Sequence, residues 1–159
     1  MNNNQTIVKM VLDRWYALQK TVDGIFDSLT DEQLQKEVAP GRNRAIYLLG
    51  HLTAVHDDMF ILLDLGNKLY PELNEPFIKS PDRAIAEIPP ASQLRSNWKK
   101  LNETLNQKIG KLQPDEWFQR HTAVSAEDFA KEPHRNKLNI MITRATHLAY
   151  HNGQLALIK

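Results

Sequence analysis

The sequence predicts an all-α protein, a four-helix bundle with a long Pro-rich connection between the second and third long helices. Four stretches of about 20 residues carry apolar side chains at steps of three and four, the spacing of one helix face. Strand-like alternation and hairpin signals are missing throughout the sequence. The region from residue 66 to residue 91 contains five prolines, which exclude a long regular helix there.

The first long helix is predicted over residues 5 to 29. Its core stripe consists of apolar residues at steps of four and three, namely Ile7, Val11, Trp15, Leu18, Val22, Ile25 and Leu29. The segment Thr30-Asp31-Glu32-Gln33 has the form of a capping box, so a short second helical piece is expected to begin there. Pro40-Gly41 is expected to end it.

The second long helix is predicted from about Arg44 to Asp64. Its stripe again steps by three and four, through Ala45, Leu48, Leu52, Val55, Met59 and Leu62. His51 stands on the same stripe, between Leu48 and Val55. His56 is five residues further on, about 140° round the helix, so it is expected to face elsewhere. The stripe therefore selects His51, and not His56, as the buried histidine.

The Pro-rich connection over residues 66 to 91 is expected to cross an end of the bundle and to cover a site there. It is long enough to join two helices that are not antiparallel neighbours. Ser92 is the expected N-cap of the third long helix, whose stripe is Leu94, Trp98, Leu101, Leu105, Ile109 and Leu112. Gln113-Pro114 ends that helix, and single helical turns are expected over residues 114 to 117 and 125 to 128.

The fourth long helix is predicted from about Lys137 to the C-terminus. One apolar edge consists of Leu138, Met141, Ala145, Leu148 and Leu155, and the adjoining face carries Ile140, Arg144, His147, His151, Gln154 and Ile158. Residues four apart on a helix lie one turn above each other on the same face. The imidazoles of His147 and His151, held in this way, can bind one metal ion.

Composition restricts the classes of function. The chain has 159 residues, which suggests a single domain over residues 1–159. Its 20 basic and 19 acidic side chains give no support for a nucleic-acid or membrane partner. The absence of cysteine excludes disulfides, thiolate zinc sites and a protein thiol nucleophile. No signal-peptide pattern follows Met1 and no apolar run approaches a membrane span, so a cytoplasmic protein is expected.

The candidate metal ligands are His51, His147 and His151. Without a thiolate in the chain, neutral imidazole is a good ligand for Zn²⁺, Ni²⁺ or Fe²⁺. A set of three protein nitrogens leaves a coordination position open, as in catalytic sites, whereas structural zinc is usually closed by four protein ligands. The competing interpretation is that a histidine on an apolar stripe is a core residue with a hydrogen-bond partner.

Each polar neighbour of these histidines admits more than one interpretation. Asp58 lies two turns after His51. Its carboxylate is a fourth ligand, a group that orients an imidazole, or simply a solvated carboxylate near the helix end. Arg144 shares the face of His147 and His151, where it binds an anionic substrate or forms a salt bridge. Gln154 either forms a hydrogen bond across the bundle or only packs. The remaining histidines, His56, His121 and His134, are expected to be exposed.

The chain resembles the DinB-like (DinB/YfiT) superfamily. The resemblance rests on Gly50-His51-Leu52 and on the ending from His147 to Gln154, His-Leu-Ala-Tyr-His-Asn-Gly-Gln, and the approach Arg135-Asn136-Lys137-Leu138-Asn139 is also similar. It covers nearly the whole chain in length and helix order. The family implies a four-helix bundle with a long connection between its second and third helices. It also implies a divalent metal held by three histidines, which map onto His51, His147 and His151. Zn²⁺ and Ni²⁺ both suit this ligand set.

The function implied by this resemblance is a metal-dependent enzyme acting on a small molecule. Characterised relatives include thiol-dependent transferases and isomerases that use low-molecular-weight thiols, and metal-dependent hydrolases. Such an enzyme acts through a metal-bound water or a co-substrate thiol, with Arg144 and Asp58 as the catalytic candidates. The resemblance also implies a homodimer. Two alternatives stay open, a non-catalytic metal-binding bundle with a structural or interaction role and a helical interaction module whose histidines are core residues.

Overall fold

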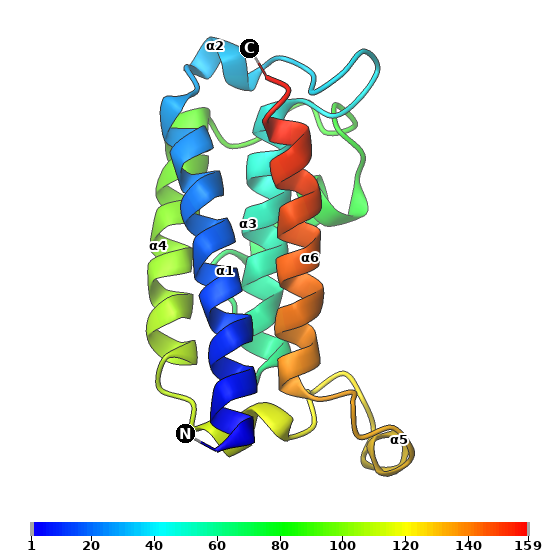
Figure 1. The fold of residues 1–159 in the computed structure, drawn as a ribbon. Helices are drawn as coiled ribbons and strands as arrows, with labels where there is room; N and C mark the ends of the chain where they lie inside the picture. Colours follow the sequence, from blue (N-terminus) through cyan, green and yellow to red (C-terminus); the bar gives the residue numbers. More distant parts are fainter. Residues whose placement is uncertain (1, 159) are drawn as a thin grey trace.

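Four long helices form the bundle in the computed structural model, which describes residues 2–158: α1 (Asn3–Ser28), α3 (Ala45–Leu62), α4 (Ala91–Ile109) and α6 (Lys137–Leu155). Helices α1 and α6 run in one direction, and α3 and α4 run in the opposite direction (Figure 1). Helix α1 packs chiefly against α6 and helix α3 chiefly against α4, while α3 also contacts α6. The described residues contain no strand, only two isolated β-bridges. The all-α bundle is therefore confirmed.

Helix α1 begins earlier than predicted because Asn2 caps it. The Asn2 side chain accepts from the backbone N–H of Gln5, and the Gln5 side chain accepts from that of Asn2. The predicted core stripe is wrong at the start of the helix, since Ile7 is 46% exposed and Val8 is buried instead. Apolar residues occupy two adjacent faces of α1, and periodicity alone does not decide which of them faces the core.

The short elements largely follow their capping signals. Helix α2 (Asp31–Leu34) is capped by Thr30, and α5 (Ala126–Lys131) is capped by Ser125. A 3₁₀ turn, η3, spans Pro114–Phe118. The predicted N-cap Ser92 is wrong, because α4 begins at Ala91 with Pro90 as its N-cap.

Helix α3 is enclosed on almost every side. Every residue from Ala45 to Asp57 except His51 is buried. Helix α4, helix α6 and the long connection all contact it, so it has no solvent-facing stripe in this part. The prediction that His56 faces away from the core is therefore wrong, since the His56 side chain has no exposed surface.

The Pro-rich connection returns the chain along the bundle, so that α4 runs parallel to α3 (Figure 1). It contains the 3₁₀ turn η1 (Pro71–Leu73) and the π-helical turn η2 (Glu75–Lys79). Near its start, the Asp57 carboxylate accepts the backbone N–H groups of Leu69 and Tyr70 at 2.7 and 2.8 Å. Near its end, Arg44 and Asp82 form a half-buried ion pair at 2.7 Å.

Between these anchors, the buried ring of Phe77 in η2 lies directly against Gly50 of α3. A Cβ atom at position 50 would meet the ring at 2.4 Å, far inside van der Waals contact. Glycine at this position therefore allows η2 to pack on the α3 backbone, beside His51. Among residues 2–158, no helix combines the length and the apolar character that a membrane span requires.

Candidate metal centre

Three histidines from two helices converge at the seam between α3 and α6. The Nε2 atom of His147 lies 3.2 Å from Nε2 of His51 and 3.1 Å from Nε2 of His151. The ligand atoms of all three side chains lie within 4.8 Å of one another. His151 is buried, and the other two are half-buried. The structure thus brings together the three residues that the sequence selected, positioned to bind a metal ion.

Hydrogen bonds fix the tautomers of two of these rings. Nδ1 of His51 lies 2.8 Å from the backbone carbonyl oxygen of Phe77, which can only accept, so Nδ1 carries the proton. Nδ1 of His151 lies 2.7 Å from the side-chain oxygen Oε1 of Gln154, which has the same effect. In both rings the lone pair of Nε2 therefore faces the third histidine. This is the arrangement in which outer partners orient metal-binding imidazoles.

The Nε2 atoms of His51 and His151 both need a hydrogen-bond donor, and His147 between them has too few protons to supply both. Neutral His147 can donate one proton from Nε2, to His51 or to His151 but not to both. If that proton is on Nδ1 instead, it has no partner, because Nδ1 of His147 is buried and unpaired among the described residues. A cation that accepts all three lone pairs removes this mismatch, so the donor set fits a divalent metal ion.

Protonation is a poor alternative to a metal ion at this place. Burial lowers the pKa of His147 to about 4, and the neighbouring His151, His51 and Arg144 act in the same direction. Burial also lowers the pKa of His51 and of His151. Near neutral pH all three rings are therefore neutral, which is the form that binds metals.

Two charged residues flank the cluster. Arg144 is half-buried one turn before His147, and its Nε has no hydrogen-bond partner among residues 2–158. Burial lowers the pKa of Arg144, and the carboxylate of Asp58 opposes this shift. Asp58 itself forms an ion pair with the ammonium group of Lys68, so it is not a free carboxylate. Of these two residues, Arg144 has the unused hydrogen-bonding capacity.

The other histidines differ in how far they follow the sequence-based prediction. His134 is exposed, as predicted. His121 was predicted to be exposed, but only 8% of its surface is accessible because its loop packs against the end of α3 through Thr122. His56 is not one of the clustered histidines; it forms a hydrogen bond at 2.8 Å with Asn102 of α4 and packs between Trp15 and Trp98.

Sequence reasoning missed the role of Phe77 and misplaced that of Gln154. The Phe77 contact is made by a backbone carbonyl, which leaves no trace in residue identity. Gln154 does not reach across the bundle but bonds to His151 on its own helix, three residues away. The spacing from His151 to Gln154 could have indicated this contact, because such residues share a helix face.

The fold and the site together define a helical-bundle protein with a three-histidine metal-binding arrangement between its second and last long helices. The family model of the DinB superfamily matches residues 14–155. The chain therefore belongs to the DinB superfamily. The comparison with curated proteins finds no match to it.

Proposed function

We propose that this protein is a metal-dependent enzyme, a thiol-dependent transferase or a hydrolase, that holds Zn²⁺ or Ni²⁺ with His51, His147 and His151. The main support for this proposal is that the Nε2 atoms of the three histidines converge in one place. When bound, a divalent ion supplies a Lewis acid that lowers the pKa of a water or thiol ligand. Three protein ligands leave a coordination position for a substrate, the usual distinction between catalytic and structural zinc sites.

The chain's own residues suggest how a substrate is held. The unpaired Nε of Arg144, one turn from His147, is placed to donate to a negatively charged group of a small molecule. The ion pair between Asp58 and Lys68 on the same side keeps the Asp58 carboxylate from neutralising Arg144 fully. Because the chain has no cysteine, a thiol in the reaction comes from a low-molecular-weight co-substrate. The carbonyl of Phe77 keeps the His51 ring in its ligating orientation.

The test is metal content and turnover in His147→Ala, measured on protein purified without a His tag. We expect one equivalent of metal in the natural protein and none in the variant, because His147 faces both other histidines. Metal affinity should fall by more than the roughly 10- to 100-fold that follows when a residue hydrogen-bonded to a metal ligand is removed, because here a ligand itself is lost. Activity in a screen of thiol co-substrates and ester or amide substrates should disappear with the metal.

His134→Ala is the matched control, because His134 is exposed and outside the cluster. Stoichiometric metal and full activity in His147→Ala would overturn the assignment. A metal-loaded protein with no turnover, whose melting temperature falls strongly with a chelator, would support a structural metal instead. The ion would then stabilise the fold by linking α3 to α6.

We also propose a homodimer formed through the groove between α1 and α6. Met10 and Ile142, which line this groove, are 67% and 47% exposed. Arg14 and Asp13 also line it, and Asp13 forms an exposed ion pair with Lys9 on its own helix. In a twofold dimer the same patch meets itself, so Arg14 of one copy can face Asp13 of a second copy. The proposed occupant is therefore a second copy of this chain.

Sedimentation velocity on Met10→Lys tests this dimer. We expect the natural chain to sediment as a dimer and the variant as a folded monomer, because a lysine in the centre of the patch must be desolvated on association. Ile61→Lys is the control, since Ile61 is also an exposed apolar residue but lies outside the groove. A natural chain that stays monomeric at high concentration would rule the dimer out.

A further inference from the structure

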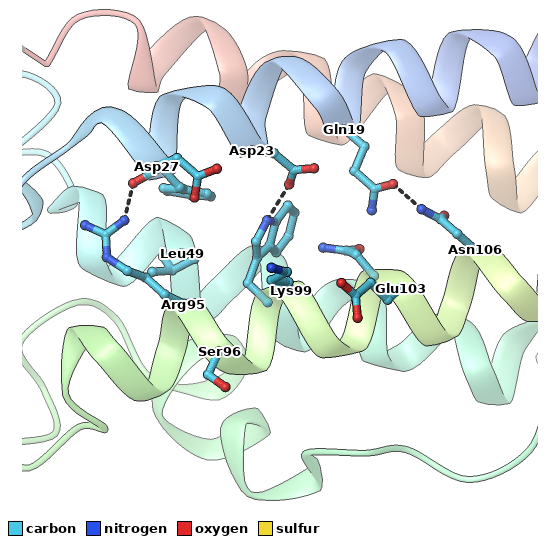
Figure 2. Close-up of a pocket in the computed structure, with 12 residues that line it drawn as sticks. Gln19, Asp23, Asp27, Leu49, Arg95, Ser96, Lys99, Glu103 and Asn106 are labelled. Carbon is cyan, nitrogen blue, oxygen red and sulfur yellow. Dashed lines mark hydrogen bonds between the residues drawn. The ribbon is translucent and has the colours of Figure 1, made fainter.

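A cavity of about 380 Å³ lies between α1 and α4, here called the α1–α4 cavity (Figure 2). Its volume falls in the range of small-molecule sites, roughly 300–1,000 Å³. Apolar walls come from Phe26, Leu49 and Trp98, and the rest of the lining is polar or charged. None of the three clustered histidines lines it. It is thus separate from the candidate metal centre.

A directional chain of hydrogen bonds ends in this cavity. The indole N–H of Trp15 can only donate, and its acceptor is Oδ1 of Asn106 at 3.2 Å. The Asn106 amide nitrogen must then point the other way, where it donates to Oε1 of Gln19 at 2.6 Å. This leaves Nε2 of Gln19 as a donor without a partner among the described residues. Figure 2 shows this amide nitrogen turned toward the space between the two helices.

A second buried amide lines the same cavity. Oδ1 of Asn102 lies 2.8 Å from Nδ1 of His56, and Nδ2 of Asn102 has no partner among residues 2–158. Gln19 is 4% exposed and Asn102 is 5% exposed. A buried donor without a partner costs about 1–3 kcal/mol, so two of them in one cavity indicate that an acceptor belongs there.

The charged groups of the lining restrict the ligand further. The Asp23 carboxylate accepts from the indole N–H of Trp98 at 2.7 Å (Figure 2). The guanidinium of Arg95 is engaged by the backbone carbonyls of Phe26 and Leu29. The other charged lining residues are Asp27, Glu103 and Lys99. The lining thus holds three carboxylates against two cations, which disfavours an anionic ligand.

We infer that the α1–α4 cavity binds a small cationic amine that also carries a neutral acceptor oxygen, such as an amino-acid amide. Its carbonyl oxygen accepts from Nε2 of Gln19 and Nδ2 of Asn102. Its ammonium group faces the carboxylates of Asp23, Asp27 and Glu103, and an apolar side chain packs on Trp98. This ligand satisfies both unpaired donors without burying a second negative charge beside Asp23.

The test uses L-leucinamide as the probe and the side-chain amide signals of Gln19 and Asn102 in an NMR titration. We expect both signals to shift with saturation, and we expect weaker binding of leucine, which adds a carboxylate, and of isopentylamine, which lacks the acceptor oxygen. Asp27→Asn should weaken leucinamide binding by about two- to fivefold, the range of an exposed ion pair. Asp27 is exposed, so this variant is expected to fold.

Asp64→Asn is the control, because Asp64 is an exposed acid that does not line the cavity. It should leave leucinamide binding unchanged. Amide signals that do not move at saturating leucinamide, and show contacts only with water, would mean that solvent satisfies the two donors and would overturn the inference. Equal binding of all three probes, or equal weakening by both variants, would also overturn it.

Discussion

Replacing Gly50 by alanine should lower the free energy of unfolding by about 1–3 kcal/mol, the usual cost of forcing extra volume into a packed core. The added Cβ would lie 2.4–2.5 Å from three atoms of the buried Phe77 ring, which has no exposed surface and little room to move. Relief requires η2 to shift away from α3. That shift moves the Phe77 carbonyl that holds His51, so metal affinity should also fall, by about 10- to 100-fold.

Chemical denaturation and metal titration of Gly50→Ala measure the two effects separately. Gly24→Ala is the matched control, because Gly24 is also inside a long helix but a Cβ atom added there would meet no atom within 4 Å. There the higher helix propensity of alanine should stabilise the protein by about 1 kcal/mol. If both variants are stabilised to the same extent, the close packing of η2 on α3 is wrong.

Acidification from pH 7 to pH 4.5 should destabilise the protein, with about 2–3 kcal/mol of the loss arising from His56 alone. Complete burial lowers the pKa of His56 to about 3, and the bond to Asn102 only partly opposes this effect. In the unfolded chain the pKa returns to its ordinary value of 6.5. Between these two values the unfolded state binds the extra proton, so stability is complete above pH 6.5 and declines as the pH falls toward 3.

Urea denaturation of the natural chain and of His56→Gln at both pH values isolates this contribution. A chelator in every sample keeps metal release from adding to the slope. The variant is expected to be less stable at pH 7, since His56 packs between two tryptophans, but its stability should depend less on pH. His134→Gln, at an exposed position, should keep the pH dependence of the natural chain. An unchanged slope in His56→Gln would contradict the assignment.

The sequence alone predicted much of the fold because helical periodicity and capping are local properties. Most of the stripe of α4 and the apolar edge of α6 are buried as predicted, and Thr30 and Ser125 cap the helices that follow them. The α1 stripe was displaced by one position near its start, because apolar side chains on adjacent faces leave the helix rotation undetermined. The N-cap of α4 was also missed.

The candidate site was likewise predicted where the signal is local and missed where it depends on packing. The spacing of His147 and His151 and the place of His51 on an apolar stripe selected the three residues that the fold brings together. The burial of His56 could not be predicted from its helix face, because α3 is surrounded by α4, α6 and the Pro-rich connection.

Residue identity determined which nitrogen and sulfur ligands are available to a metal, since the chain has six histidines and no cysteine. Only the tertiary structure decided how the rings are oriented. The His51 tautomer depends on the carbonyl of Phe77, 26 residues away in the chain. It likewise decided that the amides of Gln19 and Asn102 end without partners in one cavity, because a hydrogen bond depends on the position and direction of both groups.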